Sequence, residues 1–258
     1  MRTYIYYLNI VYICSKNYIR MVRAVENWTE TTHFDLTDIA ARRMGLSRSQ
    51  REVLCSNIMV PDRWGMLDKI RHYMPLCSIF AGELTREAIH TIQCVSREDL
   101  GLEKLGHAMH FLQDAGNPWH ARPLLPSSQK NHTVYEDYVA RNMREGFCFR
   151  HALMKTPDRW ILHPLFTEQI GEGAAHLARQ AVQHFPFLDQ CIRTDPGWQE
   201  SEQVAQITLS LLTACLQMCE TQIHSFSIRA ESQAVLPIRL PVAVTWTFLG
   251  SDERRLAI

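Results

Sequence analysis

The sequence predicts an all-α protein, a multi-helix domain with a short extended or β tail at its C-terminus. Three observations support this prediction. Apolar residues recur at helical spacing through most of residues 32–227, and capping or helix-breaking residues separate these segments. Near the C-terminus the pattern changes to an alternation of period two. With 258 residues, 46% of them hydrophobic, the chain is long enough to bury a large core.

Two helices are predicted at the start of the helical region. Over residues 32–44 apolar side chains recur at roughly helical spacing, and Gly45 follows at the position where glycine commonly ends a helix. Ser47 and Gln50 then have the spacing of a capping box, in which two side chains satisfy backbone N–H groups of the first turn. This pair predicts a second helix through about residue 58.

A long central helix and three later helices complete the predicted body. Ser96 and Asp99 repeat the spacing of a capping pattern, and they are expected to open a helix that reaches Ala115. The Gly-Asn-Pro sequence of residues 116–118 then breaks this helix. Further helices are expected over residues 131–145, 168–184 and 201–227.

The C-terminal stretch differs from the rest of the chain. Apolar residues alternate with polar or small ones over residues 236–248, which predicts a strand. Pro237 and Pro241 lie on the other face of this strand, and proline cannot donate to the ladder of a central strand. We therefore expect residues 231–258 to form an extended tail outside a helical domain of residues 28–230.

The N-terminal 27 residues are expected to be either a leader or a misassigned start of translation. Residues 4–14 form an apolar run that is too short to span a bilayer. The residues before Trp28 lack the small side chains of a signal-peptidase cleavage sequence, and Met21 offers a second start. We therefore expect Trp28 to lie inside the chain rather than at a mature N-terminus.

Composition argues against two classes of protein. Lysine and arginine together number 27, as do aspartate and glutamate, so the formal net charge is zero. Because duplex-binding proteins usually carry a basic excess, we expect no stable complex with nucleic acid, although nucleic acid remains a candidate substrate. The eight cysteines form no Cys-x-x-Cys pair, and Cys215 and Cys219 lie one helical turn apart, so buried thiols are expected rather than a disulfide framework.

Twelve histidines are present, and the chemically informative ones cluster between residues 105 and 138. His110 and Asp114 are four residues apart on the predicted central helix, a spacing that puts both side chains on one face. His120 follows the helix break, and His132 and Glu136 repeat the four-residue spacing on the next helix. Two histidines and one carboxylate are a ligand set typical of catalytic zinc with a position open for water.

The pattern H-F-x-x-D-x-x-x-P-x-H followed by H-x-x-x-E resembles the zinc-dependent phospholipase C and S1/P1 nuclease superfamily, with the bacterial phospholipase C side favoured by Glu136. The resemblance covers about residues 28–225 and implies the multi-helix fold of that superfamily. It implies that His110, Asp114, His120, His132 and Glu136 are zinc ligands, with Asp114 bridging two ions.

The same resemblance implies roles for residues in the first third of the chain. It implies zinc-ligand roles for Trp28, His33 and His72, and it gives Asp62 the catalytic role of aligning a water or taking its proton. Two departures from the family pattern stand out: Trp28 has a free amine only after cleavage, and His72 follows Asp62 by only ten residues. Two or three Zn²⁺ ions are expected, depending on whether the amine of Trp28 is free.

The implied activity is a phospholipase C that hydrolyses the glycerol-side phosphodiester of phosphatidylcholine or a related phospholipid at a membrane surface. Its products are diacylglycerol and a phosphorylated head group, and the protein is expected to be secreted or translocated out of a bacterial cell. Two alternatives stay open. One is a single-strand nuclease or 3′-nucleotidase in which Trp64, Trp119 or Tyr135 stacks on bases. The other is an inactive or truncated member of the family.

Overall fold

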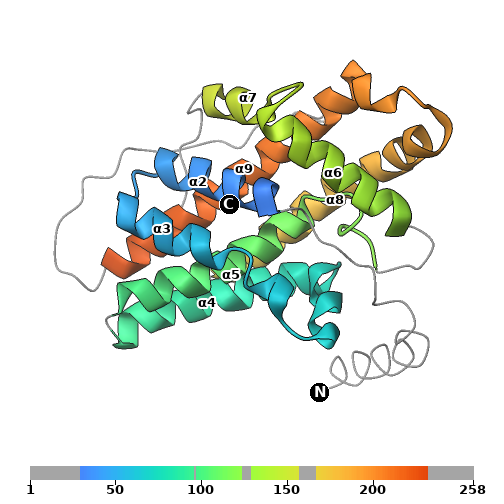
Figure 1. The fold of residues 1–258 in the computed structure, drawn as a ribbon. Helices are drawn as coiled ribbons and strands as arrows, with labels where there is room; N and C mark the ends of the chain where they lie inside the picture. The colour runs from blue at the N-terminus through green and yellow to red at the C-terminus, as the bar shows by residue number, and fades with distance from the viewer. Residues whose placement is uncertain (1–29, 96, 124–128, 157–166, 232–258) are drawn as a thin grey trace, which may run out of the picture.

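The computed structural model describes residues 30–95, 97–123, 129–156 and 167–231, and these residues form helices joined by turns and short 3₁₀ segments (Figure 1). No strand occurs in these ranges, and the prediction of an all-α fold is confirmed. The predicted leader, Trp28 and the predicted strand over residues 236–248 lie outside the described residues. The helices are α2 (Glu30–Arg43), α3 (Arg48–Asn57), α4 (Leu76–Val95), α5 (Glu98–Ala115), α6 (Gln129–Arg144), α7 (Phe149–Lys155), α8 (Thr167–Thr194) and α9 (Glu202–Glu231).

The ends of α2 and α3 follow the sequence signals closely. Gly45 has φ +74°, a left-handed conformation that favours glycine, and its N–H donates to the carbonyl of Arg42. Ser47 is the N-cap of α3, and it forms both hydrogen bonds of the capping box with Gln50. Both helix boundaries are therefore set by local sequence.

Helix α5 is the central element of the fold. It lies alongside α4 (Figure 1) and also contacts α3, α8 and α9. Its last eight residues, 108–115, are all buried, so polar side chains on this stretch face the interior. Gly106 permits the close approach of α3, because a Cβ atom there would lie 2.9 Å from the carbonyl oxygen of Leu54. The opening of α5 differs from the prediction by one residue: the N-cap is Arg97, where Ser96 was expected, and the helix begins at Glu98.

Two helices were not predicted from the sequence, namely α4 and α7. In α4 the buried Thr85 and Thr91 interrupt the apolar pattern, yet both are accommodated because their hydroxyls donate to carbonyls one turn earlier. The expected end of α8 at His184 is also wrong, since the helix continues through Pro186 to Thr194. Proline removes one backbone donor, and the buried Leu188 keeps the following turn packed against the core.

Helix α2 is tied to α6 and α7 by ion pairs at its buried face. Asp35 is inaccessible to solvent and accepts two hydrogen bonds from Arg144, at 2.9 and 3.0 Å. Arg150 adds a contact to each of Asp35 and Asp38 at 3.2 Å. Charge-assisted pairs of this kind fix both direction and register, so α2 is held against α6 and α7. No helix in the described ranges is long and apolar enough to cross a membrane.

Candidate metal centre

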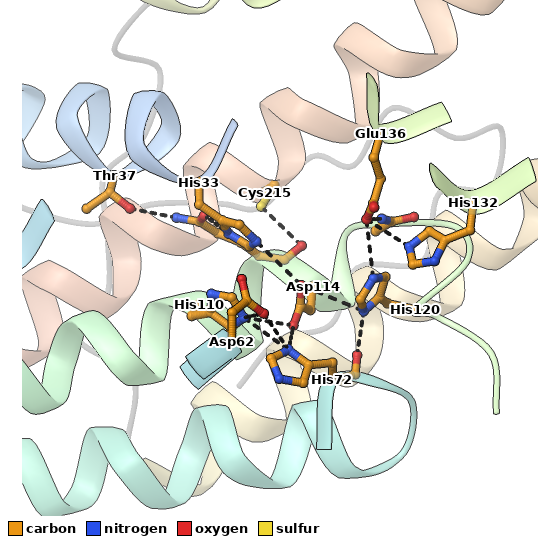
Figure 2. A network of polar contacts seen from close by, with 12 residues as sticks. His33, Thr37, Asp62, His72, His110, Asp114, His120, His132, Glu136 and Cys215 are labelled. Carbon is orange, nitrogen blue, oxygen red and sulfur yellow. Dashed lines mark hydrogen bonds and ion pairs between the residues drawn. The ribbon is translucent and has the colours of Figure 1, made fainter. Parts of the chain in front are cut away.

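Eight predicted site residues converge at the C-terminal end of α5 (Figure 2). They come from α2, from the 3₁₀ segments Pro61–Arg63 and Met66–His72, from α5 and the turn after it, and from α6. Asp62 has 18% of its side chain exposed, and the side chains of the others are at most 1% exposed. The eight are His33, Asp62, His72, His110, Asp114, His120, His132 and Glu136.

Asp114 lies at the centre of this arrangement, and its two carboxylate oxygens face different neighbours (Figure 2). Oδ2 lies 2.7 Å from Nδ1 of His72 and 3.4 Å from Nε2 of His110. Oδ1 lies 3.6 Å from Nε2 of His33 and 3.7 Å from Nδ1 of His120. A carboxylate with this placement is able to bridge two cations, one beside each oxygen.

On one side, Asp114 is joined by His33, Asp62, His72 and His110, and we call these five residues the Asp114 group. Nε2 of His110 lies 3.3 Å from Oδ1 of Asp62 and 3.0 Å from Nδ1 of His72. Within this group two overlapping sets of three, one containing Asp62 and one containing Asp114, bring a donor atom of each residue within 4.8 Å of the others. The short spacing of ten residues between Asp62 and His72 therefore does not keep them apart: Nδ1 of His72 lies 3.8 Å from Oδ1 of Asp62.

On the other side lie His120, His132 and Glu136, which we call the Glu136 group. Nε2 of His132 is 2.7 Å and Nε2 of His120 is 3.4 Å from Oε1 of Glu136. Both ring nitrogens of His132, and Oε2 of Glu136, nevertheless have no hydrogen-bond partner. One donor atom from each of these three residues lies within 4.8 Å of the others, a spacing that would let them share a bound ion.

Neighbouring groups fix which nitrogen of His120 faces Glu136. Nδ1 of His120 is 2.8 Å from the carbonyl oxygen of His72, and a carbonyl only accepts, so Nδ1 carries the proton. Nε2 is left with a lone pair on the side of Glu136. Asn117 supports the carboxylate by donating from Nδ2 to Oε1 of Glu136 at 2.9 Å, and it also accepts from the backbone N–H of Trp119.

Burial keeps two histidines neutral. It lowers the pKa of His33 to about 4, an effect that His110 adds to and Asp114 opposes. It likewise lowers the pKa of His132 to about 3. Neutral imidazole is the form that binds zinc, so both side chains are ready to act as ligands.

Charged neighbours as well as burial shift the pKa values of His110 and of the three carboxylates. Burial alone would lower the pKa of His110, but the carboxylates of Asp62 and Asp114 outweigh it and raise this pKa to about 9. Burial raises the pKa of Glu136 to about 8 against the opposing effect of His120. For Asp114 the surrounding histidines outweigh burial and lower the pKa to about 2, and the pKa of Asp62 is lowered in the same way. In the metal-free site His110 and Glu136 therefore carry protons at neutral pH, and a bound cation would have to displace them.

The remaining histidines of the described chain lie outside the two groups. His90 is exposed, and its Nε2 lies 3.3 Å from Sγ of Cys94. His107 packs against the edge of Trp64, with 5.5 Å between ring centroids. Two contacting residues were missed by sequence analysis, Gln113 and Asn117; their positions beside Asp114 and in the following turn were the available signal.

The donor set fits zinc. Histidine nitrogens and carboxylate oxygens are the usual ligands of this ion, and three of them in the Glu136 group leave a fourth position open. Burying so many ionisable groups without a compensating charge is costly, and a bound dication would offset that cost. No protein-family model matches the sequence, and no curated protein matches it.

Proposed function

We propose that this protein is a zinc-dependent phospholipase C, which hydrolyses the glycerol-side phosphodiester of phosphatidylcholine or a related phospholipid. The observation that supports this function is the pair of buried His and carboxylate groups on either side of Asp114. Enzymes that cleave phosphodiesters commonly use neighbouring metal ions to hold the attacking and leaving oxygens. The resemblance of the H-F-x-x-D-x-x-x-P-x-H segment directs the proposal to phospholipid.

The residues have distinct roles in this proposal. Zinc supplies Lewis acidity for activating water and for stabilising charge on the phosphoryl oxygens. The Asp114 group and the Glu136 group would hold the ions. Asp62, the one member with appreciable exposure, is placed to orient the attacking water or to accept its proton, in addition to lying near His110 and His72.

The surroundings of the site favour a lipid over a polynucleotide. Trp119 and Tyr135 are 3% and 1% exposed and stack on each other with ring centroids 4.7 Å apart. They are therefore not available for stacking on bases, which leaves Trp64 as the partly exposed aromatic of the three candidates. The formal net charge of zero adds no general attraction for phosphate chains.

One assay tests the proposal against the nuclease alternative. Purified protein loaded with zinc is incubated with phosphatidylcholine vesicles and, separately, with single-stranded DNA, each with and without a chelator. We expect diacylglycerol release that the chelator abolishes and that zinc restores. The matched variant Glu136→Gln, which keeps the side-chain shape but not the charge, should lose the activity. Cleavage of DNA alone, or of neither substrate, would overturn the phospholipase assignment.

A further inference from the structure

Gln113 is a fully buried amide that joins α5 to α2 beside the candidate metal centre. Its Oε1 lies 2.7 Å from Nδ1 of His33, and its Nε2 donates to Oγ1 of Thr37 at 2.9 Å. His33 and Thr37 are four residues apart and therefore on one face of α2. A second contact, 3.5 Å from Nε2 to Sγ of Cys219 on α9, keeps the amide nitrogen on that side.

These contacts decide how the His33 ring is presented. An amide oxygen accepts but cannot donate, so Nδ1 of His33 carries the proton and Nε2 has the lone pair. Nε2 is the nitrogen that faces Oδ1 of Asp114, at 3.6 Å. The plane of the ring is fixed separately by stacking on His110, with centroids 4.3 Å apart and planes 21° apart. Stacking fixes the plane, but the amide of Gln113 selects the nitrogen that faces inward.

We propose that Gln113 is a positioning residue that makes Nε2 of His33 available as a ligand of an ion that the Asp114 group would hold. This inference rests on the zinc dependence in the proposed function, but not on the substrate. If the amide were turned around, its NH₂ would donate to Nδ1 of His33. The ring proton would then lie on Nε2 and face the ion, which would exclude coordination by that nitrogen.

The Glu136 group offers a matched control within the same molecule. Asn117 supports Glu136 as Gln113 supports His33, through one amide hydrogen bond of 2.9 Å. It lies in the turn after α5, only four residues further along the chain. Loss of either amide should therefore weaken a different zinc position, and a general loss of folding would weaken both.

The test measures zinc affinity at each position and the tautomer of His33. Gln113→Met removes both hydrogen bonds at similar length, Gln113→Glu keeps the acceptor for His33, and Asn117→Leu is the control. Competition with a chelator should show that Gln113→Met weakens one zinc position about 10- to 100-fold and spares the other, as is usual for outer-shell partners. Asn117→Leu should instead lower the zinc affinity of the Glu136 group. Gln113→Glu should retain most of the wild-type zinc affinity of the Asp114 group.

Nitrogen-15 NMR of the histidine rings supplies a readout that needs no variant and no substrate. In the zinc-loaded protein, His33 should show a protonated Nδ1 and a metal-bound Nε2. A proton on Nε2 of His33, or equal weakening of both positions in Gln113→Met, would overturn the proposal. If the variants change zinc affinity as expected but the zinc-loaded protein does not hydrolyse phosphatidylcholine vesicles, the role of Gln113 stands and the phospholipase assignment fails.

Discussion

Asp114 connects the two halves of the candidate site, because its Oδ1 lies near both His33 and His120 of the Glu136 group, while its Oδ2 lies near His72 and His110. Replacing it by asparagine keeps the shape but removes the charge that would balance two cations. Losing an outer-shell partner alone costs about 10- to 100-fold in metal affinity or activity, so Asp114→Asn should cost at least about 100-fold in hydrolysis. Zinc content per chain, measured by atomic spectroscopy, should fall. The exposed Asp137→Asn is the control, and wild-type zinc content in Asp114→Asn would argue against bridging.

Two protonated groups predict how zinc affinity depends on pH. With the pKa of His110 near 9 and that of Glu136 near 8, each carries a proton at neutral pH that zinc must displace. Affinity should therefore rise about tenfold per pH unit and level off near pH 8 for the Glu136 group and near pH 9 for the Asp114 group. Proton release on zinc binding, measured by calorimetry in buffers of different ionisation enthalpy, checks this sign. Binding that is independent of pH between about 6 and 9 would contradict it.

At the residue scale, the sequence predicts what is local and misses what is distant. The pairs His110–Asp114 and His132–Glu136 follow from the geometry of one helical turn. The contact of Gln113 with His33 joins residues 80 positions apart, and no spacing rule brings such residues together. Sequence patterns therefore indicate candidate ligands, whereas the amides that orient them become visible only after the helices are packed.

At the element scale, the placement of α2 depends on Asp35. This buried carboxylate pairs with Arg144 and Arg150, and His33 lies two residues before it on the same helix. Asp35→Asn should lower the free energy of unfolding by about 2 kcal/mol, because a charge-assisted network is lost while both arginines keep access to water. Zinc binding by the Asp114 group should weaken with it. Urea denaturation monitored by circular dichroism measures the first effect.

The exposed pair Arg48–Glu52 on α3 is the control for this change. Both side chains are largely open to solvent, so Arg48→Ala should leave the denaturation midpoint unchanged. An Asp35→Asn protein as stable as the wild type would show that packing alone positions α2. A loss of stability without any change in zinc affinity would show that the ion pairs hold the helix but not the ligand.

Helices with clear boundary signals are the ones that the sequence predicts well. Ser47 and Gly45 define their helix ends by local hydrogen bonding and backbone conformation, and the structure confirms both. The helix predicted over residues 168–184 is too short, because α8 continues past Pro186 to Thr194 and its buried Leu188 packs in the core. The seven-residue helix α7 begins at Phe149. Its N-cap is Cys148, whose left-handed φ of 50° is unusual for a residue other than glycine and is not signalled by the sequence.

At the scale of the whole molecule, a polar centre occupies the interior of a helical core. Leu105, Met109 and Leu112 on α5 belong to the same apolar cluster as residues from most of the other helices, while His110 and Asp114 on that helix face the site. The periodicity of the sequence predicts the all-α class, but it does not predict how deeply the site residues are buried. Depth depends on how many helices surround α5, and that is a property of the packed chain.

Removing the metal should destabilise the whole protein, because the core contains ionisable groups that a dication would compensate. A ligand that binds only the folded chain stabilises it by about 2.7 kcal/mol at a free concentration of 100 Kd. For a domain of this size each kcal/mol shifts Tm by about 2 to 4 °C, so a chelator should lower Tm by at least about 5 °C. Thermal melts of wild type and Glu136→Gln, with zinc and with chelator, separate the contributions of the two groups to the Tm shift. The variant should retain only the shift due to the Asp114 group, and a Tm that zinc does not raise in the wild type would contradict a metal centre.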